Sequence, residues 1–246
     1  MFAGCLSLLS AGVETPTLSP LGAAVPTSAE ILHAAEDAMG TEKARAGIHS
    51  ISAIAACHGP KGDYETRVIS DRSGNLSFQQ FFPNHKNIEG ILDGRGWQLS
   101  DDGRYEWVDA IEISVLRGHE FQVMALDLGK RFHDFKTIGR AEFAGQATIQ
   151  IDMRDDLGHS ASGYFSSTSH LPVGLIVTDA RSRAPRTITL RFDAWKSVGG
   201  VNLVNHVTIL FGSETWIFDF KALQLNTADK AAFQIPGTPT RSSEQK

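Results

Sequence analysis

The chain has 246 residues, which is enough to bury a sizeable core in one large domain without metals or disulfides. Hydrophobic residues make up 41% and charged residues 21%, as in ordinary globular proteins, and the formal net charge is −5. Because the balance is acidic and lysines and arginines form no cluster along the sequence, we expect no nucleic-acid partner.

Residues 1–26 have the features of a leader. Residues 1–13 carry no charge and are too short to span a bilayer, and Gly22-Ala23-Ala24 is typical of a signal-peptidase site. We therefore predict a signal peptide and a periplasmic location. The missing basic residues leave a disordered leader as the alternative.

The chain has two cysteines. Phe2-Ala3-Gly4-Cys5 resembles a bacterial lipobox, which would anchor the chain through a lipid on Cys5, but the apolar residues directly after Cys5 disfavour this alternative. If the leader is removed, Cys57 is left alone and cannot form an internal disulfide. Cys57 ends an apolar run, so we predict a small buried residue rather than a reactive thiol.

Two segments show helical spacing. Thr27-Ser28-Ala29-Glu30 is a capping box, and the apolar residues after it recur on one helical face up to Gly40. Residues 109–128 carry apolar residues on more than one side, which predicts a helix buried against a broad surface. Gly118 in the middle of this segment predicts a kink or a break into two shorter helices.

Most of the remaining chain alternates apolar and polar residues, which is typical of strands with one dry face. Asp93-Gly94 is a two-residue hairpin signal. The pattern is clearest in residues 186–236, where three amphipathic strands are joined by short turns and the dry face is large and aromatic. Residues 226–233 predict a final short helical turn.

These patterns predict a mainly β protein with helices, of the α+β class. We expect a single curled antiparallel sheet of about ten or eleven strands that forms an open barrel, with the two predicted helices covering its concave face. No linker divides the chain, so residues 27–236 are predicted to form one domain. Residues 237–246 are polar and are predicted to be a disordered tail.

The sequence lacks the common catalytic and metal-binding motifs, and its nine histidines are scattered. We therefore predict no enzyme activity, no catalytic residue, no metal site and no cofactor. The aromatic dry faces instead suggest the wall of a ligand cavity, with ordinary core packing as the alternative for each residue. The candidate cavity residues are Phe78, Phe82, Ile151, Phe165, Leu190, Phe192, Ile209, Phe211, Trp216 and Phe218.

The order of several motifs resembles that of the periplasmic lipoprotein carriers LolA and LolB, and of the lipoprotein-like domain of MucB and RseB. The matching features are the helix end at Met39-Gly40, Pro83 before Asp93-Gly94-x-x-Trp97, the segment Gly139 to Gly145, Tyr164-Phe165 with His170-Leu171-Pro172, Phe192-x-x-Trp195 with Gly199-Gly200-Val201, and Asn226 with Phe233-x-Ile235-Pro236.

This resemblance implies an open β-barrel covered by helices, with an apolar cavity that accepts acyl chains and performs no catalysis. The implied role is a carrier for a lipid or an acylated protein, with a delivery partner at the inner or outer membrane, and we expect a monomer. The alternative is an envelope-stress sensor or protein-interaction domain of the MucB and RseB type. One departure is that Phe82 stands where the lipoprotein carrier has an arginine before the proline.

Overall fold

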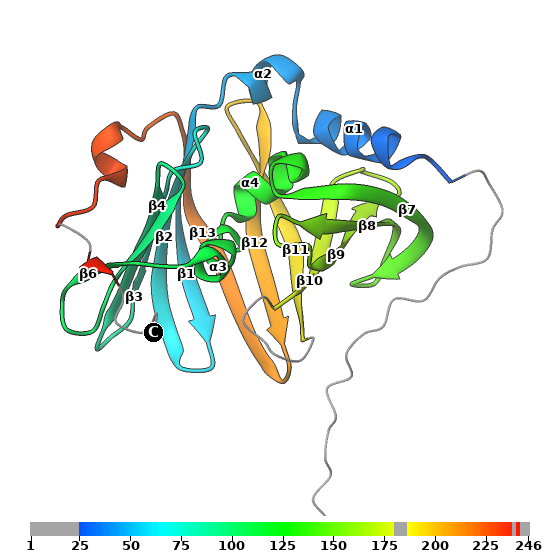
Figure 1. Ribbon diagram of the computed structural model, residues 1–246. Helices are drawn as coiled ribbons and strands as arrows, with labels where there is room; N and C mark the ends of the chain where they lie inside the picture. The colour runs from blue at the N-terminus through cyan, green and yellow to red at the C-terminus, as the bar shows by residue number, and fades with distance from the viewer. Residues whose placement is uncertain (1–24, 180–185, 238–239, 242–246) are drawn as a thin grey trace, which may run out of the picture.

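The computed structural model describes residues 25–179, 186–237 and 240–241. The predicted leader (1–26) and tail (237–246) lie largely outside these residues, as do Cys5 and the predicted signal-peptidase site. The described chain forms one curled β-sheet with short helices packed against it (Figure 1).

The elements follow one another as two runs of strands separated by helices. The helices are α1 Ser28–Met39, α2 Glu42–Ala46, α3 Ala110–Arg117 and α4 Phe121–Leu126, with 3-10 turns η1 Leu128–Lys130 and η2 Lys230–Phe233. The strands are β1 Ser50–Gly59, β2 Gly62–Asp71, β3 Leu76–Phe81, β4 Lys86–Leu92, β5 Arg95–Leu99, β6 Tyr105–Trp107, β7 Phe132–Phe143, β8 Gln146–Asp155, β9 Ser160–Ser166, β10 Pro172–Thr178, β11 Thr187–Val198, β12 Val201–Phe211, β13 Glu214–Leu225 and β14 Thr240–Arg241.

All fourteen strands belong to one sheet, in the order β14-β6-β5-β4-β3-β2-β1-β13-β12-β11-β10-β9-β8-β7. Consecutive strands pair antiparallel within each half, and β1 joins the two halves by pairing antiparallel with β13. β14 runs parallel to its neighbour β6. Asn226 secures the junction of the halves, because its Oδ1 accepts a hydrogen bond from the backbone N–H of His49 at 2.6 Å.

The predicted class, mainly β with helices, is confirmed, but the predicted number of strands is wrong. Ten or eleven strands is too few, since thirteen strands are antiparallel and β14 adds to the edge. A strand as short as β6, with three residues, shows no clear alternation in a sequence. The edge strands β7 and β14 do not pair with each other in the described chain, so the sheet curls without closing, as predicted for an open barrel.

The predicted N-terminal helix is present as α1, and both bonds of its capping box are formed. The N–H of Glu30 donates to Thr27 Oγ1 at 3.3 Å, and the N–H of Thr27 donates to Glu30 Oε2 at 2.8 Å. The helix stops at Gly40, whose φ of 142° favours glycine, and a Cβ there would lie 2.7 Å from the carbonyl oxygen of Gly200. The short helix α2 that follows was not predicted.

The segment 109–128 forms two short helices, α3 and α4, with the break at Gly118, so the second of the two forms predicted for it is the one observed. Asp109 caps α3, because its Oδ1 accepts from the N–H groups of Ile111 at 2.9 Å and Glu112 at 3.0 Å. Figure 1 shows α3 and α4 in front of the middle of the sheet, with β2 to β4 on one side and β7 to β9 on the other.

A buried glutamine attaches α4 to the sheet. Gln122 is 5% exposed, its Nε2 donates to the Val204 carbonyl at 2.6 Å, and its Oε1 accepts from the Val204 N–H at 2.8 Å. The pairing of β12 with β13 starts only at His206, so the side-chain amide occupies the place that a strand partner would take beside Val204. Both buried backbone groups are thereby satisfied.

The buried side chains form a large core and two smaller clusters. The large core lies between α1, α4 and the C-terminal half of the sheet, and includes Met39, Phe121 and Leu203. One smaller cluster lies under α3, where Leu116 packs against the inner faces of β2, β3 and β4; its buried members are Val68, Leu76, Phe78, Ile91 and Leu116. The position of α3 and α4 therefore decides which strand faces are filled by protein.

Candidate ligand-binding site

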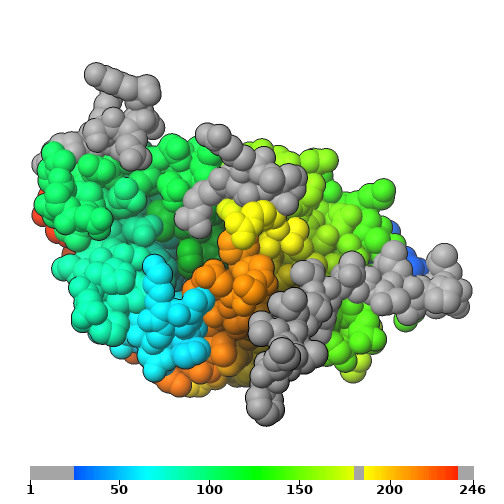
Figure 2. All heavy atoms as spheres, turned by 90° about the horizontal axis from the view of Figure 1, so that it is seen from below, coloured from blue at the N-terminus to red at the C-terminus, as the bar shows by residue number. Residues whose placement is uncertain are grey.

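A cavity of about 610 Å³ lies between the sheet and the two helices α3 and α4. The β1–β2 hairpin from Gly59 to Gly62, Glu214 of the β12–β13 hairpin and Thr178 at the end of β10 are among its lining residues. In the view from below, Figure 2 shows the surface hollowed between the β1–β2 hairpin in cyan and the β12–β13 hairpin in orange. The volume falls in the range of small-molecule pockets, roughly 300–1,000 Å³.

The sheet side of this cavity is apolar and largely aromatic. Tyr64 stacks on Phe82 with ring centroids 4.6 Å apart, and Phe82 stacks on His85 at 4.3 Å. Phe218 meets Phe121 of α4 edge to face at 5.2 Å. These contacts fix the rings, so we call this surface the aromatic wall. Its members from the sheet are Tyr64, Phe82, Leu190, Ile209, Phe211, Trp216 and Phe218.

Six of the ten predicted cavity residues line this cavity. They come from three strands and from the residue after β3, and all point to the same side of the sheet; they are Phe82, Leu190, Ile209, Phe211, Trp216 and Phe218. The period-2 alternation correctly grouped the members from β12 and β13, since residues two apart on a strand share a face. Their contact with a ligand stays a prediction.

The other four predicted residues lie elsewhere. Phe78 is 2% exposed and packs in the cluster under α3, with its ring centroid 4.5 Å from that of His119. Ile151 and Phe192 are buried in the large core. Phe165 is also buried there and borders a separate groove of about 450 Å³ beside α1. For these four, neighbouring side chains and helices already occupy the space beside the strand face.

Several lining residues were not predicted. Val115 and Met124 come from α3 and α4, and Tyr64 and Phe132 come from strands. The helical pair lies in a segment that was interpreted as apolar on more than one side and therefore buried. That same feature could have indicated a helix that faces a cavity on one side and packed protein on the other.

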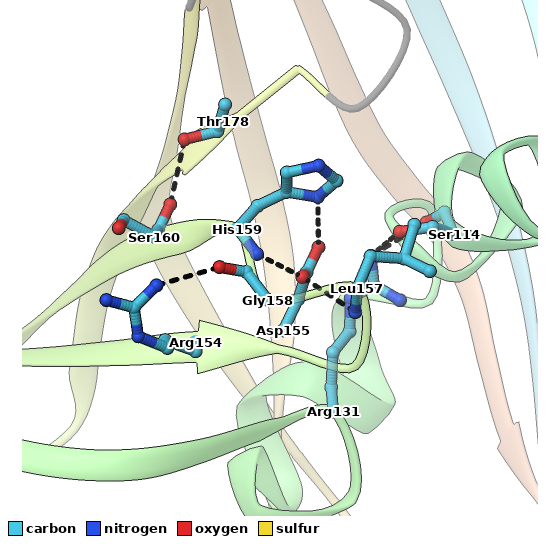
Figure 3. A network of polar contacts seen from close by, with 9 residues as sticks. All are labelled: Ser114, Arg131, Arg154, Asp155, Leu157, Gly158, His159, Ser160 and Thr178. Atoms are coloured by element: carbon cyan, nitrogen blue, oxygen red, sulfur yellow. Dashed lines mark hydrogen bonds and ion pairs between the residues drawn. The ribbon is translucent and has the colours of Figure 1, made fainter.

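One end of the cavity is polar and is built by the turn between β8 and β9. Asp155 Oδ1 accepts from the N–H groups of Leu157 at 3.0 Å and His159 at 2.8 Å, and Asp155 Oδ2 lies 3.1 Å from His159 Nδ1. Arg131 directly precedes β7, and its Nη2 donates to the carbonyl of Ser114 at 2.7 Å (Figure 3). We call Arg131, Asp155 and His159 the polar end.

A second cavity of about 770 Å³ lies on the other side of α3 and α4. Ser114, Met124 and Arg131 line both cavities, so the two helices separate them. Two arginines of the second cavity are paired with carboxylates: Arg45 with Glu36 at 3.2 Å and Arg117 with Glu120 at 2.8 Å. Ion pairs therefore occupy part of the lining of this cavity.

Cys57 is buried beside the cavity wall, opposite Tyr64 in the pairing of β1 with β2, and Tyr64 lines the cavity. Burial raises the pKa of the Cys57 thiol to about 11, and the sulfur lies 3.2 Å from Thr66 Oγ1. Burial also raises the pKa of Tyr64. Both groups are neutral at ordinary pH, so neither adds charge to the aromatic wall, and the prediction of a buried, unreactive Cys57 agrees with this environment.

No protein-family model matches the chain, and no curated protein matches it. Solved structures do. A LolA superfamily protein from Nitrosomonas europaea matches with a TM-score of 0.59 and 11% identity, over 86% of this chain and 99% of that one. A putative outer membrane lipoprotein-sorting protein domain from Vibrio parahaemolyticus matches with a TM-score of 0.59 and 14% identity, over 84% and 97%. The chain has the LolA fold.

The same fold also occurs in a DUF1329 family protein from Desulfovibrio piger, which matches with a TM-score of 0.56 and 10% identity over 85% of this chain and 100% of that one. At these identities the likeness concerns the backbone arrangement. The resemblance inferred from scattered motifs is thus confirmed at the level of the LolA fold, while the function of this chain depends on its own cavity.

Within the LolA fold of this chain, Phe82 is held between Tyr64 and His85 by ring stacking. It closes the aromatic wall at the end of β3 and offers no charge to the helices. In this chain α3 is attached instead by Arg117, which donates to the carbonyl of Gly74, and α4 by Gln122. Arg131 adds a contact at the cavity itself, because it donates to the carbonyl of Ser114 in α3.

Neither metal ligation nor a membrane span is evident in the described ranges. No three histidine, cysteine, aspartate or glutamate side chains come together there as possible metal ligands. Likewise, no helix within those ranges is both long and apolar enough to cross a membrane.

Proposed function

We propose that this chain is a non-enzymatic carrier or binding protein of the cell envelope that holds a lipid, or the acyl chain of an acylated protein, in the cavity under α3 and α4. The single observation that carries this proposal is the aromatic wall, which lines a cavity of about 610 Å³ inside the LolA fold. An ordinary core would fill that volume with side chains.

The energetics of such a site favour an alkyl ligand. Burying a methylene group contributes roughly 0.8 kcal/mol, so about ten methylenes in contact with the aromatic wall would contribute roughly 8 kcal/mol before the cost of immobilising the chain. Stacked rings lose little conformational freedom on binding, because Tyr64 and Phe82 are already held by each other.

The proposal of no catalysis also rests on geometry. Asp155 and His159 form an aspartate–histidine pair in the lining of this cavity, but two backbone N–H groups of their own turn donate to the Asp155 carboxylate. Such an arrangement stabilises the β8–β9 turn. Ser114 and Ser160 also line the cavity, but within the described residues neither hydroxyl is hydrogen-bonded to His159, and Cys57 is buried and neutral.

A periplasmic location and a delivery partner at the inner or outer membrane belong to this proposal, because a soluble carrier needs a donor and an acceptor for its lipid. The names of the structural neighbours, a LolA superfamily protein and a lipoprotein-sorting domain, support it. A protein that binds this chain stoichiometrically while the cavity stays empty would instead favour a protein-interaction domain.

Native mass spectrometry and lipid extraction test the proposal directly. Full-length protein purified from a host with bacterial membranes should carry bound or exchangeable lipid, and complete absence of lipid would contradict a carrier role. Trp216→Glu places a charge on the aromatic wall and should abolish lipid retention, because a carboxylate there opposes an alkyl chain.

Trp107→Glu is the matched control. Trp107 is also a partly exposed tryptophan on a strand, but it lies in β6 under the guanidinium of Arg95, 3.6 Å from its ring centroid, and does not line the cavity. This variant should retain lipid. Circular dichroism on both variants separates loss of binding from loss of folding.

A further inference from the structure

The guanidinium of Arg131 carries a charge that is not neutralised by direct contact. Its Nη2 donates to the carbonyl of Ser114 at 2.7 Å and contacts Ser114 Oγ at 3.3 Å. Within the described residues no carboxylate oxygen lies within 4.0 Å of its nitrogens, although other arginines of α2 and α3, such as Arg45 and Arg117, have such partners.

The surroundings of Arg131 leave its charge incompletely compensated. Burial lowers the pKa of Arg131, and this effect exceeds the opposing influence of the Asp155, Glu120 and Asp156 carboxylates, which act from a greater distance. The residue stays protonated at ordinary pH. Arg131 is partly buried, and a cation without a carboxylate in direct contact is costly in such a place, so an anion that enters the cavity would gain from contact with it.

The neighbouring carboxylate of Asp155 makes no direct contact with the Arg131 guanidinium that would exclude a bound anion. Asp155 Oδ1 accepts from the N–H groups of Leu157 and His159, and Oδ2 lies 3.1 Å from His159 Nδ1. Figure 3 shows Arg131 reaching towards Ser114 beside this turn rather than into the carboxylate. Arg131 also borders both cavities, so its free donor edge is accessible to a molecule that lies in either.

We propose that Arg131 binds the anionic group of an amphiphile, a carboxylate or a phosphate, whose alkyl chain lies along the aromatic wall. This inference rests on the proposed carrier function and adds the chemical class of the ligand. Guanidinium groups bind carboxylates and phosphates through charge-assisted, often bidentate hydrogen bonds, which fix the orientation of the ligand as well as its affinity. The bound molecule would therefore have a defined direction, with its polar group at the β8–β9 turn.

The test compares ligands that differ only in the head group. Displacement of a fluorescent apolar dye from the full chain measures the affinities of dodecanoic acid, dodecyl phosphate and dodecanol, with acetate and inorganic phosphate as free anions. We expect the acid and the phosphate to bind at least about ten-fold more tightly than the alcohol, a difference that corresponds to one charge-assisted contact. Free anions at equal concentration should not displace the dye.

Arg131→Gln should remove this preference, because the neutral glutamine amide offers no charge-assisted hydrogen bond to a carboxylate or a phosphate. Arg154→Gln is the matched control. Arg154 lies at the end of β8, beside the β8–β9 turn, and donates to the Gly158 carbonyl at 2.9 Å. It is exposed and does not line the cavity, so its variant should keep the preference.

The outcomes separate this inference from the carrier function. Equal affinities for acid and alcohol in the unmodified protein would overturn the role of Arg131 and leave the carrier function standing. A preference that survives Arg131→Gln would overturn the assignment to Arg131. Dye displacement by acetate or inorganic phosphate alone would show a site for small anions and overturn the proposal that the ligand is an amphiphile. Failure of all three alkyl ligands would overturn the carrier function itself.

Discussion

Two aromatic regions of the same sheet differ in what covers them. Phe78 of β3 is 2% exposed and packs among Leu76, Ile91 and Leu116. Trp216 of β13 faces the cavity and is only partly buried by protein. Both side chains belong to strands with the same alternation of apolar and polar residues, so the strand pattern alone does not distinguish a core position from a cavity wall.

The helix α3 accounts for the difference. Leu116 points into the cluster around Phe78, whereas the preceding residue, Val115, lines the cavity. Adjacent helical residues point in different directions, so one helix can fill the space over β2 to β4 and leave space over β12 and β13. The comparison shows that the apolar strand faces differ in how they are covered because of the position of α3.

The largest expected effect concerns the filled region. Phe78→Ala removes a ring from a closed cluster and should lower the free energy of unfolding by about 3–5 kcal/mol. Phe211→Ala, on the partly exposed aromatic wall, should cost less than about 1 kcal/mol, since no closed cluster loses its packing. Urea unfolding of both variants measures this difference. Equal losses would show that the wall is ordinary core.

The next largest expected effect is a pH dependence of stability due to Cys57, which is buried behind the aromatic wall. Burial raises the pKa of Cys57 to about 11 from 9.0, so the folded state keeps a proton that the unfolded chain releases. Stability due to this group is complete below pH 9 and falls as the pH rises towards 11, by about 2–3 kcal/mol in total. Urea unfolding at intermediate pH values measures the slope.

The matched control for the pH effect is Cys57→Ala. The free energy of unfolding of this variant should change less between pH 9 and 10 than that of the unmodified protein. At higher pH the raised pKa of Tyr64 also lowers the free energy of unfolding. Rapid alkylation of Cys57 in the native protein at neutral pH would contradict the burial on which this prediction rests.

A smaller effect concerns the attachment of the helices that separate the two regions. Gln122→Leu leaves the N–H and carbonyl of Val204 without their side-chain partners and should lower the free energy of unfolding by about 2 kcal/mol. Gln224→Leu, an exposed strand position, should change it little. Hydrogen exchange at the Val204 amide offers a local readout, and unchanged protection there would contradict the assigned role.

The smallest expected effect is on binding alone. Trp216→Ala removes part of the aromatic wall and should weaken the binding of dodecanol about ten-fold, equivalent to roughly 1.4 kcal/mol, with a small loss of stability. The dye-displacement measurement described above reports it. A loss of stability comparable to that of Phe78→Ala, without a change in affinity, would reverse the comparison between the two regions.

Much of the fold could be predicted from local chemistry. The capping box at Thr27 and Glu30, the turn at Asp93-Gly94 and the break at Gly118 are each determined by residues close together in the chain, and each is present in the structure. The strand count was less accurate, because β6 is too short to show a period.

The candidate site could be predicted only in part. Residues such as Ile209 and Phe211, or Trp216 and Phe218, share a strand face by their spacing and line the cavity together. Phe78 and Ile151 show the same spacing and lie in packed protein. Their difference depends on contacts with residues far away in the sequence, which no local pattern contains.

The sequence by itself determined the strands, the helix ends and the apolar character of one face, because these depend on side chains a few positions apart. The tertiary structure alone decided where that face stays open, and it brought Arg131, Asp155 and His159 to the polar end of the cavity. The reason is physical: a cavity and its charged end arise from how a sheet curls and where helices pack on it, and these are properties of the whole chain.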